Sequence, residues 1–186
     1  MTERRSPTDP GTLLATTHEV DEGLRVRLRL ARPNDAERVR LFLTGLSPET
    51  RRQRFFGAEE RVPDALVRHF TFFDPRERLV VAATAPLDGG EQLVGLADVL
   101  LLATGLAEVG VVVDDRAQGR GLGKLLIEAV AALARRQGAQ HLKAQLLSEN
   151  EPMRRLMQWL GRVVETVDGN ERALYVELPG ERRSAA

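Results

Sequence analysis

The sequence predicts an α+β (α/β) fold, a single domain with a mixed, mostly antiparallel central sheet of about six to seven strands flanked by helices. Three observations support this. Residues 24–30 alternate apolar side chains with arginine, which is typical of a half-buried strand. Apolar runs between residues 79 and 113 are separated by the turn sequences Asp88-Gly89-Gly90 and Thr104-Gly105, as in an antiparallel meander. After residue 122 the apolar residues recur at helical spacing.

Composition excludes several classes of function. The 186 residues are 42% apolar, carry zero net charge and include no cysteine. Zero net charge favours neither a nucleic acid nor an anionic membrane as partner. Without cysteine there is no disulfide, thiolate metal site or cysteine nucleophile. The three histidines lack the spacing of metal ligands, so we expect no metal. No stretch resembles a membrane span or a signal peptide, and we expect a cytoplasmic protein, either a monomer or a homodimer.

The first 23 residues show no clear hydrophobic period, and we expect residues 1–23 to be a flexible N-terminal tail. The folded domain is expected over residues 24–178, followed by a flexible polar tail at 179–186. Within the domain, helix starts are predicted at Pro33, at Ser47, whose hydroxyl can cap the helix, and at Pro63. The remaining elements are predicted as strands 79–85, 93–102, 106–113 and 141–147, helices 122–138 and 150–161, and a hairpin of 163–167 with 173–178.

The stretch that organises the chain is an apolar strand, a turn and then Gly119, Gly121 and Gly123 at the start of a helix. The first turn of a helix has unpaired N–H groups and the positive end of the helix dipole, so it can bind a phosphate. A Walker A loop is excluded because Gln118 and Leu125 stand where it needs glycine and a hydroxyl. A dinucleotide fingerprint starting at Gly119 is excluded because its third glycine would be Lys124.

Gln118, Gly121 and Gly123 instead fit the pattern Gln/Arg-x-x-Gly-x-Gly/Ala, and this loop resembles the acetyl-CoA loop of the GNAT acetyltransferase superfamily. The order of predicted elements from Leu24 to Leu178 is similar to the GNAT fold. A second family signature is Asn150 followed by an apolar helix that ends at Leu160-Gly161. The segment 46–56, with Arg54-Phe55-Phe56, is similar to the acetyltransferase domain of bacterial Pat-type protein-lysine acetyltransferases.

The resemblance implies acetyl-CoA as co-substrate. It implies that the backbone of Val111, Val112 and Val113 pairs with the pantetheine arm like an added strand. Asn150 would bond to that arm or to a nearby water, unless it serves only as the cap of its helix. The resemblance further implies that the pyrophosphate is held by the backbone N–H groups of Gln118, Gly119, Arg120, Gly121, Leu122, Gly123 and Lys124.

Glu108 is the candidate catalytic residue. An amine acceptor with a pKa of ~10 is mostly protonated at neutral pH, so a base must take its proton. Glu108 is the only charged residue between Leu106 and Val113, one strand length before the loop. Pat-type enzymes resemble this chain in having a glutamate on that strand. The alternative is a strand glutamate that faces solvent or pairs with an arginine.

The resemblance implies an N-acetyltransferase acting on a primary amine by direct transfer in a ternary complex, since no cysteine is present to carry an acetyl group. A protein lysine is the leading acceptor, and a polyamine, an amino acid or an aminoglycoside is the second. Many family members carry a tyrosine as general acid where this chain has Met157. A catalytically weak acyl-CoA sensor is therefore the third possibility.

Overall fold

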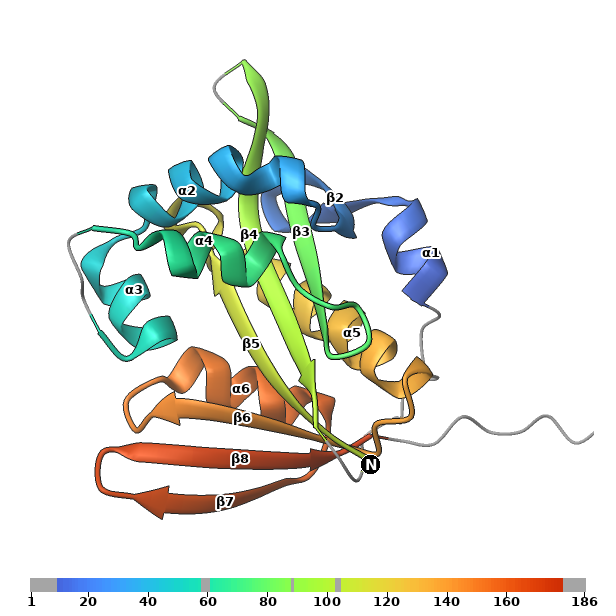
Figure 1. The fold of residues 1–186 in the computed structure, drawn as a ribbon, viewed down its shortest axis with the longest axis vertical. Coiled ribbons are helices and arrows are strands. Elements are labelled where there is room, and N and C mark those ends of the chain that lie inside the picture. The colour runs from blue at the N-terminus through green and yellow to red at the C-terminus, as the bar shows by residue number, and fades with distance from the viewer. Residues whose placement is uncertain (1–9, 58–60, 88, 103–104, 179–186) are drawn as a thin grey trace, which may run out of the picture.

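The computed structural model describes residues 10–57, 61–87, 89–102 and 105–178. Eight strands form one sheet in the order β1-β2-β3-β4-β5-β6-β8-β7, and among them only β5 and β6 run parallel (Figure 1). The predicted α+β class with a mixed, mostly antiparallel sheet is confirmed, with more strands than the six or seven expected. The strands are β1 (Thr17–Val20), β2 (Leu24–Leu30), β3 (Arg78–Leu87), β4 (Gly90–Leu101), β5 (Leu106–Val113), β6 (His141–Leu147), β7 (Val163–Asp168) and β8 (Glu171–Glu177).

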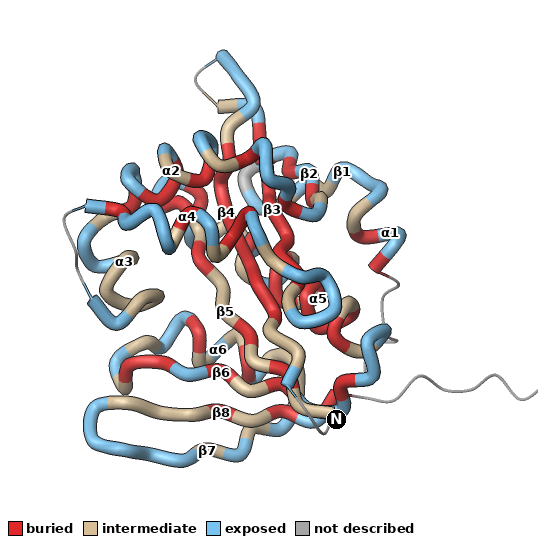
Figure 2. The backbone as a smooth tube through the Cα atoms, viewed as in Figure 1, coloured by how far each residue is buried: buried red, intermediate tan, exposed pale blue. Residues whose placement is uncertain are grey.

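Six α-helices, within the ranges that the structure describes, cover the two faces of this sheet. One face carries α1, α5 and α6, whose apolar side chains meet the sheet in the larger core. The opposite face carries α2, α3 and α4 over a second core around Phe42 and Phe70 (Figures 1 and 2). The helices are α1 (Pro10–Ala15), α2 (Ala36–Gly45), α3 (Pro48–Phe55), α4 (Asp64–Thr71), α5 (Leu122–Arg136) and α6 (Glu151–Leu160).

Local sequence explains where the helices around the site begin. The hydroxyl of Ser47 accepts a hydrogen bond from the N–H of Thr50 at 3.1 Å and caps α3, as predicted. The side-chain oxygen of Asn150 accepts from the N–H of Met153 at 3.0 Å and caps α6, also as predicted. Gly121 precedes α5 with a φ of 84°, which glycine adopts without the steric cost of a side chain.

The N-terminal segment differs from the tail that the sequence predicts. Residues 10–23 form α1, β1 and a short 3-10 helix at Asp21–Gly23, and β1 pairs antiparallel with β2. Leu13 is buried in the larger core, and the N–H of Asp21 donates to the carbonyl of Arg120 at 3.0 Å. Residues 1–9 and 179–186, the rest of the predicted tails, lie outside the described residues.

The described residues contain no helix long and apolar enough to cross a membrane. They likewise contain no group of histidine and carboxylate side chains that could hold a metal ion.

Candidate functional site

The glycine loop follows β5 and leads into α5, in the place that the sequence predicts. Gly119 and Gly121 have φ values of 75° and 84°. This left-handed conformation costs a residue with a Cβ roughly 1–2 kcal/mol, so the two glycines are required by the backbone. Because Gly121 stands at the N-cap, the N–H groups of the first turn of α5 have no partner four residues earlier within the helix, although the N–H of Lys124 donates to the carbonyl of Gly121 at 3.0 Å.

Gly123 has a different role from the other two glycines. A Cβ at position 123 would lie 3.3 Å from the Cδ1 atom of Leu156, which belongs to α6. Gly123 therefore allows α5 to approach α6 closely, whereas Gly119 and Gly121 shape the loop backbone. The sequence pattern located all three glycines but did not distinguish these roles.

Strands β5 and β6 separate beyond Glu108. Their parallel pairing joins residues 106–108 to residues 141–143. On its other side, β5 remains paired with β4 up to Val113, while β6 pairs with β8 along its length. The edge of β5 that carries Val111, Val112 and Val113 therefore turns toward an opening in the sheet rather than toward a neighbouring strand. Such an edge offers backbone groups to an extended ligand.

Asp115 connects the start of α3 to the loop. Its carboxylate accepts hydrogen bonds from the N–H of Ser47 at 2.9 Å and from the hydroxyls of Ser47 and Thr50, each at 2.7 Å. The side-chain amide of Gln118 donates to the hydroxyl of Thr50 and to the carbonyl of Val113, both at 3.1 Å. Burial alone would raise the pKa of Asp115, but these hydrogen bonds lower it. Asp115 therefore stays ionised and holds α3 against the loop.

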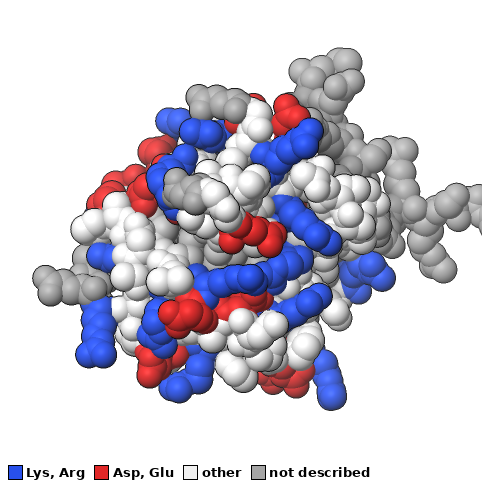
Figure 3. Space-filling view, turned by 90° about the horizontal axis from the view of Figure 1, so that it is seen from above, with Lys and Arg blue, Asp and Glu red and all other residues white. Residues whose placement is uncertain are grey.

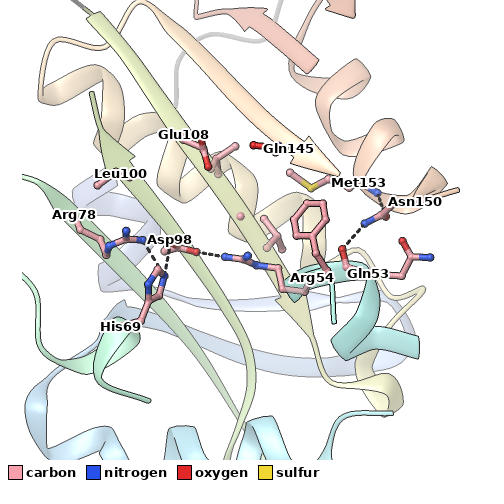
Figure 4. A pocket seen from close by; sticks show the side chains of 14 residues that line it. Gln53, Arg54, His69, Arg78, Asp98, Leu100, Glu108, Gln145, Asn150 and Met153 are labelled. Atoms are coloured by element: carbon pink, nitrogen blue, oxygen red, sulfur yellow. Dashed lines mark hydrogen bonds and ion pairs between the residues drawn. The ribbon is translucent and has the colours of Figure 1, made fainter. Parts of the chain in front are cut away.

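A pocket of about 160 Å³ lies where the strands separate (Figure 4). Its walls come from α3, α4, α6 and strands β3 to β6. Glu108 and Val111 line it, together with Asn150 from the start of α6. The structure thus brings three of the predicted site residues to one cavity. Met157, which stands where a general-acid tyrosine was considered, is fully buried in the larger core.

The carboxylate of Glu108 is paired with a lysine. Its Oε2 atom accepts from the Nζ atom of Lys143 at 2.9 Å, and the two residues are register partners on β5 and β6. About a third of the Glu108 side chain is exposed. The alternative expected from the sequence was a non-catalytic Glu108 that pairs with an arginine or faces solvent. The lysine pair leaves the carboxylate beside the pocket.

Asn150 makes two hydrogen bonds within the protein. Besides capping α6, its Nδ2 atom donates to the carbonyl of Gln53 in α3 at 3.2 Å. Asn150 therefore joins α6 to α3 across one end of the pocket (Figure 4). The sequence identified its cap role, while the contact with Gln53 joins residues far apart in the chain and carries no local signal.

The most buried charge in the pocket is Asp98 on β4, which the sequence analysis did not identify. Its two oxygens accept from the Nη2 atom of Arg54 in α3 and the Nη1 atom of Arg78 in β3, both at 2.5 Å. The Nε2 atom of His69 in α4 lies 3.2 Å from Asp98 and 2.9 Å from Arg78 (Figure 4). Burial raises the pKa of Asp98, but the positive charges of Arg54 and Arg78 and the hydrogen bond with His69 outweigh it and lower that pKa to about 2.

Gly110 makes room for Arg54. A Cβ at position 110 would lie 2.1 Å from the Nη2 atom of Arg54, closer than atoms of real side chains approach. An isolated glycine inside a strand often marks a close approach of another group. Gly110 in its apolar strand was therefore the one feature of the sequence that could have indicated this contact. The identity of the approaching group depends on α3, which the strand pattern does not reveal.

Comparison with known proteins agrees with this geometry. The Acetyltransferase (GNAT) family matches residues 43–161. The chain is 32% identical over 145 residues to acetyltransferase PA5475 of Pseudomonas aeruginosa, covering 77% of this chain and 78% of that protein. It is 31% identical over 140 residues to acetyltransferase Pat of Mycolicibacterium smegmatis, covering 73% of this chain but only 40% of Pat. The solved GNAT domain of S. lividans PAT superposes with a TM-score of 0.78 and 27% identity, covering 88% of this chain and 96% of that domain.

Proposed function

Because the chain belongs to the GNAT acetyltransferase family, an acetyl-CoA-dependent family, we propose that it transfers the acetyl group directly to a primary amine within a ternary complex. The observation that carries this proposal is the opening between β5 and β6. Glu108 and the backbone edge at Val111 line the same pocket there. A protein lysine and a small amine are the two acceptor classes.

In this proposal the loop residues Gln118–Lys124 hold the pyrophosphate through backbone N–H groups, and Val111–Val113 pair with the pantetheine arm. The left-handed glycines and the start of α5 support the first assignment. The edge of β5 that faces the opening supports the second. Bound in this way, acetyl-CoA supplies an activated acetyl thioester. Asn150 contacts the arm by exchanging its bond to Gln53.

Glu108 is the proposed base. An amine that enters as an ammonium ion loses one proton to solvent by way of the Glu108 carboxylate. The neutral nitrogen then forms the N–C bond while the C–S bond breaks. A second proton of the amine passes to the leaving CoA thiolate, directly or by exchange with solvent, and the third stays on the amide product. Met157 has no proton to give and is fully buried, so the thiolate receives its proton from the amine or from solvent.

The experiment compares Glu108→Gln with Glu177→Gln, a control on β8 that is exposed and does not line the pocket. Thiol release with an accepted amine should fall about 100-fold or more in Glu108→Gln, as is typical for loss of a general base, and stay unchanged in the control. Calorimetry should show the same acetyl-CoA affinity for both variants. Undiminished turnover in Glu108→Gln would remove Glu108 from the mechanism.

The weak-sensor alternative rests on the burial of Met157. It predicts tight acetyl-CoA binding without thiol release for any amine. Binding together with amine-dependent thiol release would exclude it. If acetyl-CoA does not bind at all, both the transferase proposal and the sensor alternative fail.

A further inference from the structure

The side of the pocket opposite Glu108 holds an excess of positive charge. Arg54 and Arg78 each carry one positive charge, and the carboxylate they share, Asp98, neutralises one of the two. Glu108 is balanced by Lys143. Both arginines are mostly buried, with side chains 21% and 18% exposed, so water compensates this charge only in part.

The two guanidinium groups also have more donors than the protein uses. Each arginine presents five N–H donors, and Asp98 offers two oxygens. The Nε atom of Arg54 is buried without a hydrogen-bond partner. A buried donor without a partner is costly, and planar guanidinium groups bind carboxylates well. The Nε atom itself faces Gly110 and is closed to the pocket, so a second carboxylate that enters from the pocket would bind the remaining Nη donors of Arg54 and Arg78.

The strand register places this cluster close to the proposed base. Asp98 is the register partner of Gly110, and Glu108 is the partner of Leu100, two residues further along β4. Residues in this diagonal relation lie about 7–8 Å apart and point to the same face of the sheet. Arg54, Arg78 and Glu108 all line the same cavity (Figure 4). One small molecule can therefore contact both the arginine cluster and Glu108.

Building on the proposed transferase function, we propose that the acceptor carries a carboxylate close to its amine, with the carboxylate held by Arg54 and Arg78 and the amine directed toward Glu108. A free amino acid has this pair of groups. A lysine within a protein chain has no carboxylate of its own near its amine. The pocket therefore favours a small amino acid over a protein lysine as acceptor.

The test measures thiol release with the common amino acids as free acids, with their matched amides, with cadaverine and with a lysine-containing peptide. At least one free acid should exceed its own amide about tenfold or more in kcat/KM, as expected for a hydrogen-bonded charge. Where no compound turns over, calorimetry of the same acids and amides with the CoA-saturated protein measures the preference directly. Equal use of acid and amide, turnover of the peptide alone, or no binding of any free acid overturns the proposal.

The variant Arg78→Gln should reduce the preference for the free acid to about twofold or less, through a rise in KM. The matched control is Arg76→Gln, whose side chain is 93% exposed and lies outside the pocket. It should keep the preference. Acetyl-CoA affinity shows whether each variant is folded. If Arg78→Gln does not fold, the comparison of free acids with their amides on the unaltered chain tests the proposal by itself. Loss of acetyl-CoA binding by the unaltered chain would instead refute the transferase function itself.

Discussion

At the scale of single residues, Asp98 has the largest influence on its neighbours. It is a buried carboxylate that receives two guanidinium groups and a histidine from three different elements. Removing one partner from a buried ion pair leaves the other charges uncompensated, which is more damaging than loss of a surface pair. Asp98 therefore stabilises the wall of the pocket as well as orienting its arginines.

Replacing Asp98 with asparagine should lower the free energy of unfolding by about 3 kcal/mol, the range seen when one partner of a buried pair is removed. Asp74→Asn is the control. The Asp74 carboxylate lies 4.0 Å from the Nε atom of the exposed Arg76, and asparagine keeps the side-chain oxygen that accepts from the Arg76 N–H, so the loss of stability should be below about 0.5 kcal/mol. Urea denaturation of the three proteins measures the difference. Equal stabilities would show that the cluster contributes nothing to folding.

The same residue predicts a pH dependence. The pKa of Asp98 is lowered from 3.8 to about 2 in the folded state. The ionised carboxylate therefore stabilises the fold above pH 4, and this contribution of about 2 kcal/mol is lost as the pH falls from about 4 to about 2. Between these values, the difference in stability between the unaltered chain and Asp98→Asn should shrink. A difference independent of pH would contradict the assignment of this pKa to Asp98.

Residues with a local signal could be predicted from the sequence, and residues brought together by the fold could not. The loop glycines and the cap at Asn150 follow from patterns within a few positions of each residue. The sequence does not distinguish Asp98, Arg54 and Arg78 from ordinary charged residues on a strand or a helix. They come together only when α3 packs over the sheet. Even Glu108, identified from its strand, acquired its partner Lys143 only through the pairing of β5 with β6.

At the scale of elements, the regular spacing of apolar residues predicted most strands and helices, because each of these elements buries one face. β1 was missed because Thr17–Val20 is at the edge of the sheet and has no fully buried residue. β1 is held in the sheet by its antiparallel pairing with β2, and its sequence has no hydrophobic alternation that would predict a strand. The start of α5 was predicted correctly, since the glycines that precede it are required by its backbone.

Gly121→Glu should abolish detectable binding of acetyl-CoA, because it adds bulk and negative charge where the pyrophosphate is proposed to lie. It also strains a residue with a φ of 84°. Gly89→Glu controls for both changes, since Gly89 has a φ of 82° in the β3–β4 turn, outside the glycine loop, and open space around it. Calorimetry should show normal affinity for Gly89→Glu. Retained affinity in Gly121→Glu would contradict the loop assignment.

At the scale of the whole molecule, the described N-terminal residues belong to the fold. Leu13 packs into the larger core, β1 extends the sheet, and Asp21 bonds to the glycine loop. On the face seen in Figure 3, basic and acidic side chains of the described residues are interspersed. Pairing of charges, rather than a field of one sign, therefore dominates the electrostatics of this face.

Deleting residues 1–23 should lower the melting temperature and weaken acetyl-CoA binding, because it removes Leu13 from the core and the contact of Asp21 with Arg120. Deleting residues 1–9 alone is the control, and the difference between the two shortened proteins isolates the contribution of residues 10–23. Thermal unfolding and calorimetry measure both effects. Identical behaviour of the two deletions would support the flexible tail that the sequence predicted.

The fit of Arg54 over Gly110 limits the order in which this protein can change. The guanidinium group occupies the volume that any larger residue at position 110 would need. In a double-mutant cycle, Gly110→Ala should be harmful beside Arg54 and tolerated beside Arg54→Ala, with a coupling energy of about 0.5–3 kcal/mol. A mutational path must therefore shorten residue 54 before it enlarges residue 110. Substitutions at these two positions, 56 residues apart in the chain, are therefore expected to be coupled.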